Sequence, residues 1–228
     1  MAANGDYRVL ILTSDGATID EVTEIGRRNF QDSTVVYWEL GNAETKPDVI
    51  AQIEATDYNL IISHINGVIL KPHQLAKATY GAVNIHPAPP EHPGAFGIWC
   101  QPVIARGIRT HHGTTVHEMD AEIDHGPIYR VDRWEVPEDA TIQHVVERSF
   151  GDCLAVTAEV AEELARSPDG SGCFTRIDEH WDGTNGHHTV EDVRAWFAAL
   201  DPEHPAHQER IPLNHPRAII TPPYFDDE

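Results

Sequence analysis

The chain has 228 residues, of which 40% are apolar and 23% charged. This size and composition predict one domain, or one domain with an appendage, and enough apolar side chains for a substantial core. Acidic residues number 37 against 16 Lys and Arg, a formal net charge of -21 with His neutral. Such a surface repels phosphate backbones and anionic membranes, and the few basic residues are scattered, so nucleic-acid and membrane binding are disfavoured.

The first sixteen residues lack a basic stretch followed by a long apolar run, so we expect no signal peptide. The apolar runs of the chain are long enough for strands but not for membrane spans. The chain has three cysteines, Cys100, Cys153 and Cys173. Their odd number and uneven spacing favour a reducing compartment over a disulfide framework. We therefore expect a cytoplasmic location.

Strands and helices alternate through the first half of the chain. We expect strands at Tyr7–Thr13, Thr34–Trp38, Asn59–Ser63 and Ala82–His86. Between them we expect helices at Thr18–Asn29, Pro47–Ala55 and Pro72–Ala78. This alternation predicts a Rossmann-like α/β fold, in which a mostly parallel sheet is wound with helices on both faces.

The second half begins with two expected strands, Gly113–Asp120 and Pro127–Val136, which a tight turn joins. The clearest helix of the chain is Ile142–Leu164, because apolar residues recur there at helical spacing. We divide the chain after this helix. Residues 1–166 form a catalytic core, and residues 167–228 form a small C-terminal extension that packs on the core or in an oligomer interface.

The extension opens with residues 167–188, whose Gly, Asp and His content predicts a loop or linker. A last helix is expected at Val190–Leu200, starting from Thr189, with Asp192 placed for a capping box. One further strand is expected at Ala218–Thr221 in the Pro-punctuated tail.

Asn84 and His86 stand one residue apart in the fourth strand, so their side chains leave the same face. The Pro-rich segment that follows stops the strand and forces an extended loop. In a wound parallel sheet, ligands bind at the carboxyl ends of strands. A strand end with two ordinary hydrogen-bonded polar residues explains this segment equally well.

Asp124 lies in the tight turn before the strand at Pro127. A carboxylate held at such a turn can orient an imidazole and favour its protonated form. An Asp that bonds only to its own backbone is the commoner arrangement in turns, and both interpretations stay open.

Taken together, these segments resemble N10-formyltetrahydrofolate-dependent formyltransferases over about residues 58–166. The order of the two motifs is specific, with 37 residues between His86 and Asp124. The residues that carry the resemblance are Gly67-Val68-Ile69-Leu70, Asn84-Ile85-His86-Pro87, the Pro-rich loop to Gly94, Thr115-Val116-His117 with Met119-Asp120, and Asp124-x-Gly126-Pro127-Ile128.

The resemblance implies a catalytic trio. In it, Asn84 donates a hydrogen bond to the oxyanion of the tetrahedral intermediate, His86 moves protons, and Asp124 orients His86. It also implies N10-formyltetrahydrofolate as formyl donor. The folate site would then comprise Gly67, Val68, Leu70, Asp120 and Ile123.

The amine acceptor is constrained by two departures from the family pattern. Ala88-Pro89-Pro90 stands where members commonly carry a Ser followed by Leu-Leu-Pro, and the loop at residues 13–18 is not the Gly-rich phosphate loop of the purine-pathway branch. Residues 192–205 resemble the added C-terminal segment of members that modify amino sugars on nucleotides. We therefore expect an amino sugar, nucleotide-linked or free, or a secondary-metabolite amine.

Several alternatives remain open. They are formyl transfer to glycinamide ribonucleotide or to a hydroxyornithine-type amine, hydrolysis of formyltetrahydrofolate, and a non-catalytic binding module on the same fold. A homodimer is one arrangement left open. The 15 His match no zinc-ligand spacing, so we expect no metal. For Trp181 and Trp196 we favour packing, although Trp181 lies in a turn-rich region where it could stack on a base or sugar.

Overall fold

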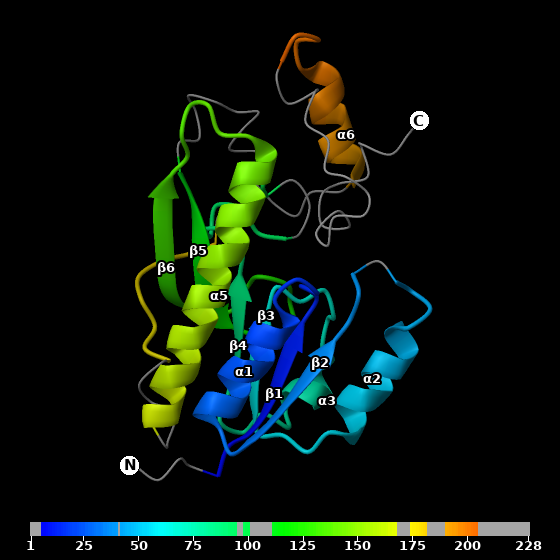
Figure 1. Ribbon diagram of the computed structural model, residues 1–228, viewed down its shortest axis with the longest axis vertical. Helices are drawn as coiled ribbons and strands as arrows, with labels where there is room; N and C mark the ends of the chain where they lie inside the picture. Colours follow the sequence, from blue (N-terminus) through cyan, green and yellow to red (C-terminus); the bar gives the residue numbers. More distant parts are fainter. Residues whose placement is uncertain are drawn as a thin grey trace.

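The computed structural model describes residues 6–40, 42–94, 98–100, 111–167, 174–181 and 190–204. A six-stranded sheet with the order β2-β1-β3-β4-β5-β6 forms the middle layer. Helices cover both of its faces, as Figure 1 shows. The predicted α/β architecture is thereby confirmed.

The first four strands are parallel to one another, and the last two are antiparallel additions at one edge. The sheet is therefore mostly parallel, as predicted, and each strand lies within a few residues of its predicted position. The strands are β1 Arg8–Thr13, β2 Asp32–Tyr37, β3 Leu60–His64, β4 Ala82–His86, β5 His111–Glu118 and β6 Ile128–Glu135.

The helices also lie close to their predicted positions, and only α3 is clearly shorter. Tyr80 N donates to the carbonyl of Asn59 at 2.8 Å, which draws the chain toward β4 soon after α3 ends. The longest helix, α5, begins after Thr141, whose hydroxyl caps it by accepting from His144 N at 3.0 Å. The helices are α1 Ile19–Asn29, α2 Lys46–Ala55, α3 Pro72–Leu75, α5 Ile142–Arg166 and α6 Val190–Ala199.

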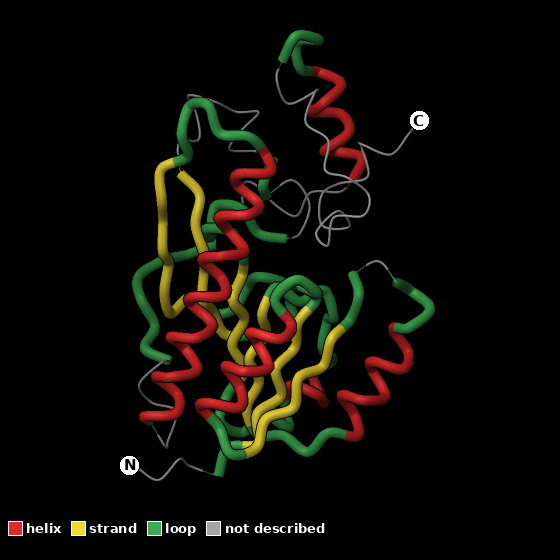
Figure 2. Tube along the Cα trace, viewed as in Figure 1, coloured by secondary structure: helices red, strands yellow, loops and turns green. Residues whose placement is uncertain are grey.

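Two apolar clusters form the core, one on each face of the sheet. In β1, Val9 and Ile11 belong to the cluster under α1 and α5, while Leu10 and Leu12 belong to the cluster under α2. This split follows from the alternation of side chains along a strand. Figure 2 shows the sheet enclosed between these helices. Because both faces are covered, the strands are buried and their carboxyl ends are left to form a site.

The C-terminal part of the chain returns to the core in residues 174–181, which contain no helix or strand. Ile177 N donates to the carbonyl of Ile128 in β6 at 3.0 Å. In α6, Phe197 is buried with the first core cluster, and Trp196 packs against it. The expected helix at 190–200 is thus confirmed, while Thr189 and the strand expected at Ala218–Thr221 lie outside the described residues.

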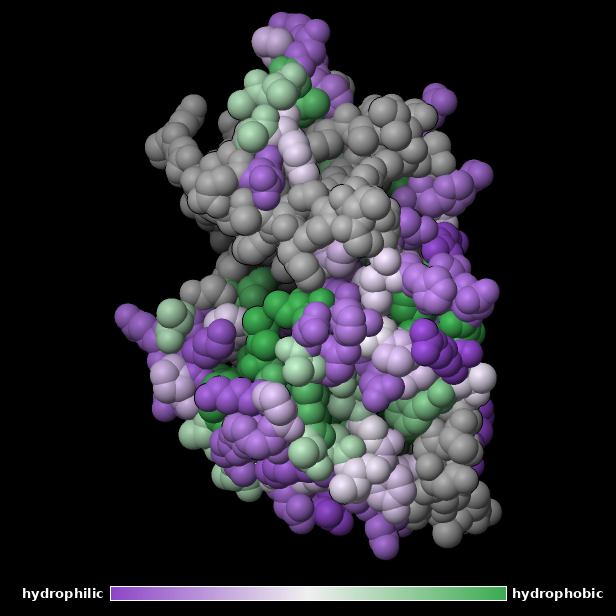
Figure 3. All heavy atoms as spheres, turned by 180° about the vertical axis from the view of Figure 1, so that it is seen from behind, coloured by the Kyte–Doolittle hydropathy of each residue, from purple (hydrophilic) through white to green (hydrophobic). Residues whose placement is uncertain are grey.

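Hydrophilic residues cover much of the described surface in Figure 3, as expected for a chain of this charge. Among the residues that the structure describes, none of the helices is both long and apolar enough to cross a membrane.

Candidate active site

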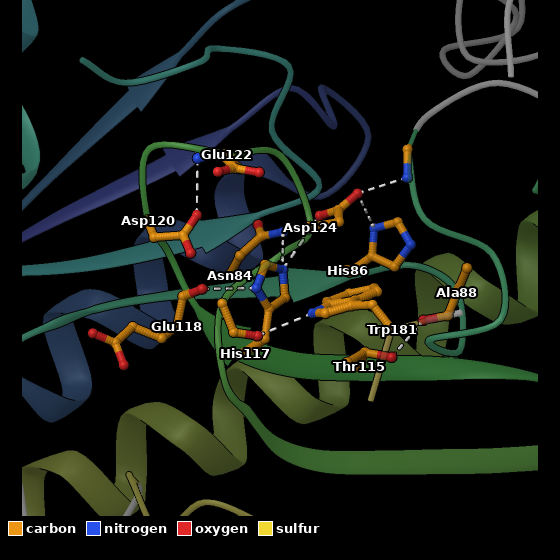
Figure 4. Close-up of polar contacts among 12 residues, drawn as sticks. Asn84, His86, Ala88, Thr115, His117, Glu118, Asp120, Glu122, Asp124 and Trp181 are labelled. Carbon is orange, nitrogen blue, oxygen red and sulfur yellow. Dashed lines mark hydrogen bonds and ion pairs between the residues drawn. The ribbon is translucent and has the colours of Figure 1, made fainter. Parts of the chain in front are cut away.

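The candidate site lies at the carboxyl end of β4, where the parallel part of the sheet meets the antiparallel part. The register of β4 and β5 pairs Asn84 with His117 and His86 with Thr115. Directly opposed residues of antiparallel strands have neighbouring side chains. The two predicted residues of β4 therefore lie against polar residues of β5, and Figure 4 shows this group.

His86 is 3% exposed, and polar partners face both of its ring nitrogens. Its Nε2 donates to the carbonyl oxygen of His92 at 2.8 Å, and its Nδ1 lies 3.6 Å from Asp124 Oδ2. The Pro-rich loop places His92 there by bending back over the end of β4. Since Nε2 keeps its hydrogen for the carbonyl, Nδ1 is the atom at which His86 gains or loses a proton.

Asp124 occupies the turn between β5 and β6 with a φ of 46°, in the left-handed region that Asp and Asn tolerate better than most residues. Its Oδ2 accepts a hydrogen bond from Gly94 N at 2.7 Å, and its Oδ1 lies 3.3 Å from His117 Nε2. Asp124 therefore touches both ends of the Pro-rich segment, His86 before it and Gly94 after it.

The carboxylate of Asp124 is the charged member of this group. Burial acts to raise the pKa of Asp124, but His86, His117 and the Gly94 N–H together outweigh it and hold that pKa well below its usual range. Asp124 is consequently ionised at neutral pH. A buried anion at this position favours a positive charge on the His86 imidazole beside it.

His117 is a site residue that the sequence analysis did not single out for a role. Its Nδ1 donates to the carbonyl of Glu118 at 2.8 Å, and its Nε2 lies 3.0 Å from Asn84 Nδ2. His117 thereby connects Asn84 to Asp124. His117 belongs to the Thr115-Val116-His117 segment of the family resemblance, but only the strand register shows that it faces Asn84.

Trp181 is the second residue that the sequence analysis left out of the site. Its ring centroid lies 5.7 Å from that of His86 and 4.8 Å from that of His117, with both pairs nearly perpendicular. Its Nε1 donates to the carbonyl of Gly126 at 3.0 Å. The prediction that Trp181 is a packing residue is thus confirmed, but the residues that it packs against belong to the candidate site.

The loop between β5 and β6 is held in shape by its own polar groups. The carboxylate of Asp120 accepts from Glu122 N at 2.8 Å and pairs with His125 Nδ1 at 2.8 Å. The same carboxylate raises the pKa of His125. At Gly126 a Cβ atom would lie 2.2 Å from the carbonyl oxygen of Glu118, so this position requires glycine.

The residues predicted for the folate site lie in two segments, residues 67–70 after β3 and the loop from Asp120 to Ile123 after β5. Val68 and Leu70 are 3% and 4% exposed in the second core cluster, and Met119, just before Asp120, packs against that cluster. Gly67 N donates to Ser14 Oγ at 3.1 Å. The apolar side chains left open are Ile69, 59% exposed, and Ile123, 47% exposed. Val68 and Leu70 thus pack in the core, whereas Ile69 and Ile123 are open to a ligand.

The loop after β1 holds a buried carboxylate instead of an open phosphate cradle. Asp15 is 1% exposed; its Oδ1 accepts from Ala17 N at 3.1 Å and its Oδ2 from the Thr18 hydroxyl at 2.7 Å. A helix N-terminus ordinarily attracts anions, but here a carboxylate already occupies the entry to α1.

The Pro-rich loop, where Ala88-Pro89-Pro90 departs from the family pattern, is attached to β5. Thr115 Oγ1 donates to the carbonyl of Ala88 at 2.7 Å.

Covalent catalysis by cysteine has no support in the described part of the chain. Cys100 and Cys153 are buried, and burial raises the pKa of the Cys153 thiol.

The arrangement of an imidazole, a buried carboxylate and an amide at a strand end suits acid–base chemistry on a bound carbonyl compound. A sequence profile of the formyl transferase family matches residues 13–151. The chain belongs to the formyl transferase family, and it is an enzyme of that class. A search of curated protein sequences found no match.

Solved structures with the same fold include a sugar N-formyltransferase from a Shewanella species, 17% identical, with a TM-score of 0.63 over 93% of this chain and 85% of that one. A formyltransferase from Anoxybacillus kamchatkensis, in complex with UDP-4,6-dideoxy-4-formamido-L-AltNAc and tetrahydrofolate, is 18% identical, with a TM-score of 0.60 over 87% and 94%. A glycinamide ribonucleotide transformylase from Symbiobacterium toebii is 17% identical, with a TM-score of 0.54 over 70% and 88%.

Proposed function

We propose that this enzyme transfers a formyl group from N10-formyltetrahydrofolate to the primary amine of a small molecule, and that the acceptor is an amino sugar. The observation that carries the proposal is the contact of the buried Asp124 carboxylate with His86 at the end of β4. The donor is further supported by the formyltransferase from Anoxybacillus kamchatkensis, whose structure contains tetrahydrofolate.

In the proposed reaction one bond forms, one bond breaks and one proton moves. The acceptor nitrogen forms a bond to the formyl carbon, the bond from that carbon to N10 of the folate breaks, and one proton passes from the amine to N10. His86 carries this proton at Nδ1, because its Nε2 hydrogen is committed to the His92 carbonyl. Asp124 stabilises the imidazolium that forms when Nδ1 takes up the proton.

In the proposed mechanism, Asn84 stabilises the negative charge that develops on the formyl oxygen by donating a hydrogen bond to it. Its side chain is only partly buried, so a ligand can reach the amide. Oxyanion donors of this kind contribute about 2.7–4 kcal/mol in other enzymes. His117 holds the amide through its Nε2, 3.0 Å from Asn84 Nδ2.

Residues 67–70 and the loop from Asp120 to Asp124 are the segments proposed to form the folate site. Val68 and Leu70 form a buried wall, and Ile123 supplies an exposed apolar surface beside Asp124. When bound, the folate supplies the activated formyl group. The polar groups of the Asp120 loop lie next to this surface and would bond the polar edge of the pterin.

Two observations support an amino sugar over glycinamide ribonucleotide as acceptor. The sugar N-formyltransferase from Shewanella aligns with 93% of this chain, and the purine-pathway enzyme with 70%. In addition, the Asp15 carboxylate accepts a hydrogen bond from Ala17 N at the entry to α1. Because this carboxylate already occupies the place of an anion, the loop is poorly suited to a phosphate group.

The donor is tested first by thermal shift and calorimetry with 5-formyltetrahydrofolate, a stable isomer. We expect the ligand to raise the melting temperature of the wild type and to bind Ile123→Glu at least tenfold more weakly. Tyr37→Glu, which changes another exposed apolar side chain on the far edge strand β2, is the matched control. Absence of binding at millimolar ligand would contradict the donor assignment.

The acceptor is then tested with N10-formyltetrahydrofolate and a panel of amines. The panel contains nucleotide-linked amino sugars, free amino sugars, glycinamide ribonucleotide and a hydroxylated ornithine. We expect mass spectrometry to detect a formylated amino sugar. Formate release at the same rate with and without every amine would instead indicate hydrolysis.

A further inference from the structure

Trp181 reaches the candidate site from a part of the chain that follows the strands and helices of the core. It lies in residues 174–181, beyond the end of α5 at Arg166. Its ring is nearly perpendicular to those of His86 and His117, at interplanar angles of 74° and 85°. One indole thus touches both imidazoles that Asp124 contacts.

Trp181 and Asp124 both lie beside His86, as Figure 4 shows. The imidazole is therefore in contact with both a carboxylate and an indole. A positive charge is attracted to the π-system of Trp, most strongly where water is excluded. The indole also fills space that water would otherwise occupy beside a residue that is 3% exposed.

The position of Trp181 is determined by contacts on both sides of it. Its own Nε1–H binds the Gly126 carbonyl, close to Asp124 in sequence. Upstream, Glu179 pairs with Arg133 of β6 at 2.9 Å, and Phe174 packs on Tyr129 with ring centroids 5.4 Å apart. The segment is thereby attached along β6, and this attachment delivers the indole to the imidazoles.

We propose that Trp181 is a positioning residue for formyl transfer, holding His86 and His117 against Asp124 and favouring the positively charged form of His86 through its π-face. The inference rests on the proposed function for its kinetic consequence and on the geometry alone for its effect on the imidazoles. It makes residues 174–181 part of the catalytic unit.

Other groups also set the charge of His86 and must stay unchanged in the test. Asp124 faces it from the β5–β6 turn and His92 from the Pro-rich loop, and His117 of β5 contacts the same Asp124 carboxylate. His112, further along β5, is also coupled to it electrostatically. A substitution at Trp181 changes none of these four residues.

The test compares Trp181→Leu with Trp181→Phe. Leu fills apolar volume without a π-face, whereas Phe retains an aromatic face, and both lose the bond to Gly126. Trp134→Phe, which changes a Trp of β6 that contacts His112, is the matched control. We expect Trp181→Leu to lower kcat about tenfold with KM for the donor within twofold, and Trp181→Phe to recover most of kcat.

The second readout is an NMR titration of the His86 ring without substrates. We expect Trp181→Leu to move its titration midpoint downward by about 0.5–1 pH unit, because the cation loses its π-partner, with little change in Trp181→Phe and Trp134→Phe. The acidic limb of the kcat/KM profile should move in the same direction.

An unmoved midpoint in a folded Trp181→Leu protein overturns the inference, whether or not formyl transfer is observed. A kcat within twofold of wild type overturns it as well. A moved midpoint in a protein that transfers no formyl group supports the effect on His86 and counts against the proposed function instead. A failure of the Trp181 inference can therefore be distinguished from a failure of the proposed function.

Discussion

Asp124 Oδ2 lies 3.6 Å from His86 Nδ1, although 37 residues separate them in the chain. The contact forms because the Pro-rich loop and the β5–β6 turn meet over the end of β4, where Gly94 N donates to the same oxygen at 2.7 Å. Each Asp124 oxygen thus has a partner that a substitution can remove.

Replacement of His86 by Ala removes the proposed proton carrier. We expect turnover to fall by about 10²- to 10⁴-fold, the usual contribution of general acid–base catalysis. Affinity for 5-formyltetrahydrofolate should remain within a few-fold, because the imidazole acts on the transfer and not on the pterin. Steady-state kinetics and calorimetry check this. His73→Ala, at an exposed His in α3, is the control, and loss of folate binding in a folded His86→Ala protein would contradict the role.

Asp124→Asn removes the charge while preserving the turn, because Asn tolerates the φ of 46°. We expect turnover to fall by about 10²-fold or more, with the Gly94 contact kept by the amide oxygen. Asp124→Ala should lose stability as well, since it cannot accept the Gly94 hydrogen bond. If Asp124→Asn were fully active in a kinetic assay, the carboxylate would have no part in the reaction.

The buried His112 makes the stability of the fold depend on pH. Burial, followed by repulsion from His92, lowers the pKa of His112 from 6.5 to about 3. The unfolded chain therefore binds a proton here at a pH where the folded chain does not, so the free energy of unfolding falls as pH decreases from about 6.5 to about 3. The slope is at most about 1.4 kcal/mol per pH unit for one such group.

His112→Gln should flatten this slope, since Gln hydrogen-bonds but does not titrate. Urea unfolding at a series of pH values measures it, with the neighbouring exposed His111→Gln as control. Equal slopes in wild type and His112→Gln would show that other groups dominate. The depressed pKa of Asp124 acts in a lower window: its stabilisation is present above the ordinary value of 3.8 and is lost below it.

Two glycines should respond in opposite ways to the same substitution. Gly126→Ala places a Cβ 2.2 Å from the Glu118 carbonyl, so the turn that carries Asp124 must shift. We expect a loss of about 1–3 kcal/mol and a strong loss of turnover. Gly151 lies within α5 with nothing within 4 Å of an added Cβ, so Gly151→Ala should stabilise the fold by about 0.5–1 kcal/mol. Denaturant unfolding of both variants tests the contrast, and destabilisation by Gly151→Ala would be the contrary result.

The strands, the helices and part of the candidate site could be predicted from the sequence, because the signals for them are local. Alternating apolar runs and helical spacings predicted each described strand and helix to within a few residues. The spacing of Asn84 and His86 predicted a shared face, and the prolines after them predicted a strand end. Asp124 was recognisable from its turn and from the resemblance to formyltransferases.

The tertiary structure alone decided which distant side chains complete the site. The pairing of Asn84 with His117 depends on the register of β4 and β5, and a shift of one residue would turn His117 to the other face. Trp181 reaches His86 only because residues 174–181 attach along β6. Neither contact has a local sequence signal, since each depends on packing between segments far apart in the chain, whereas the strands and turns that carry them depend on their neighbours in sequence.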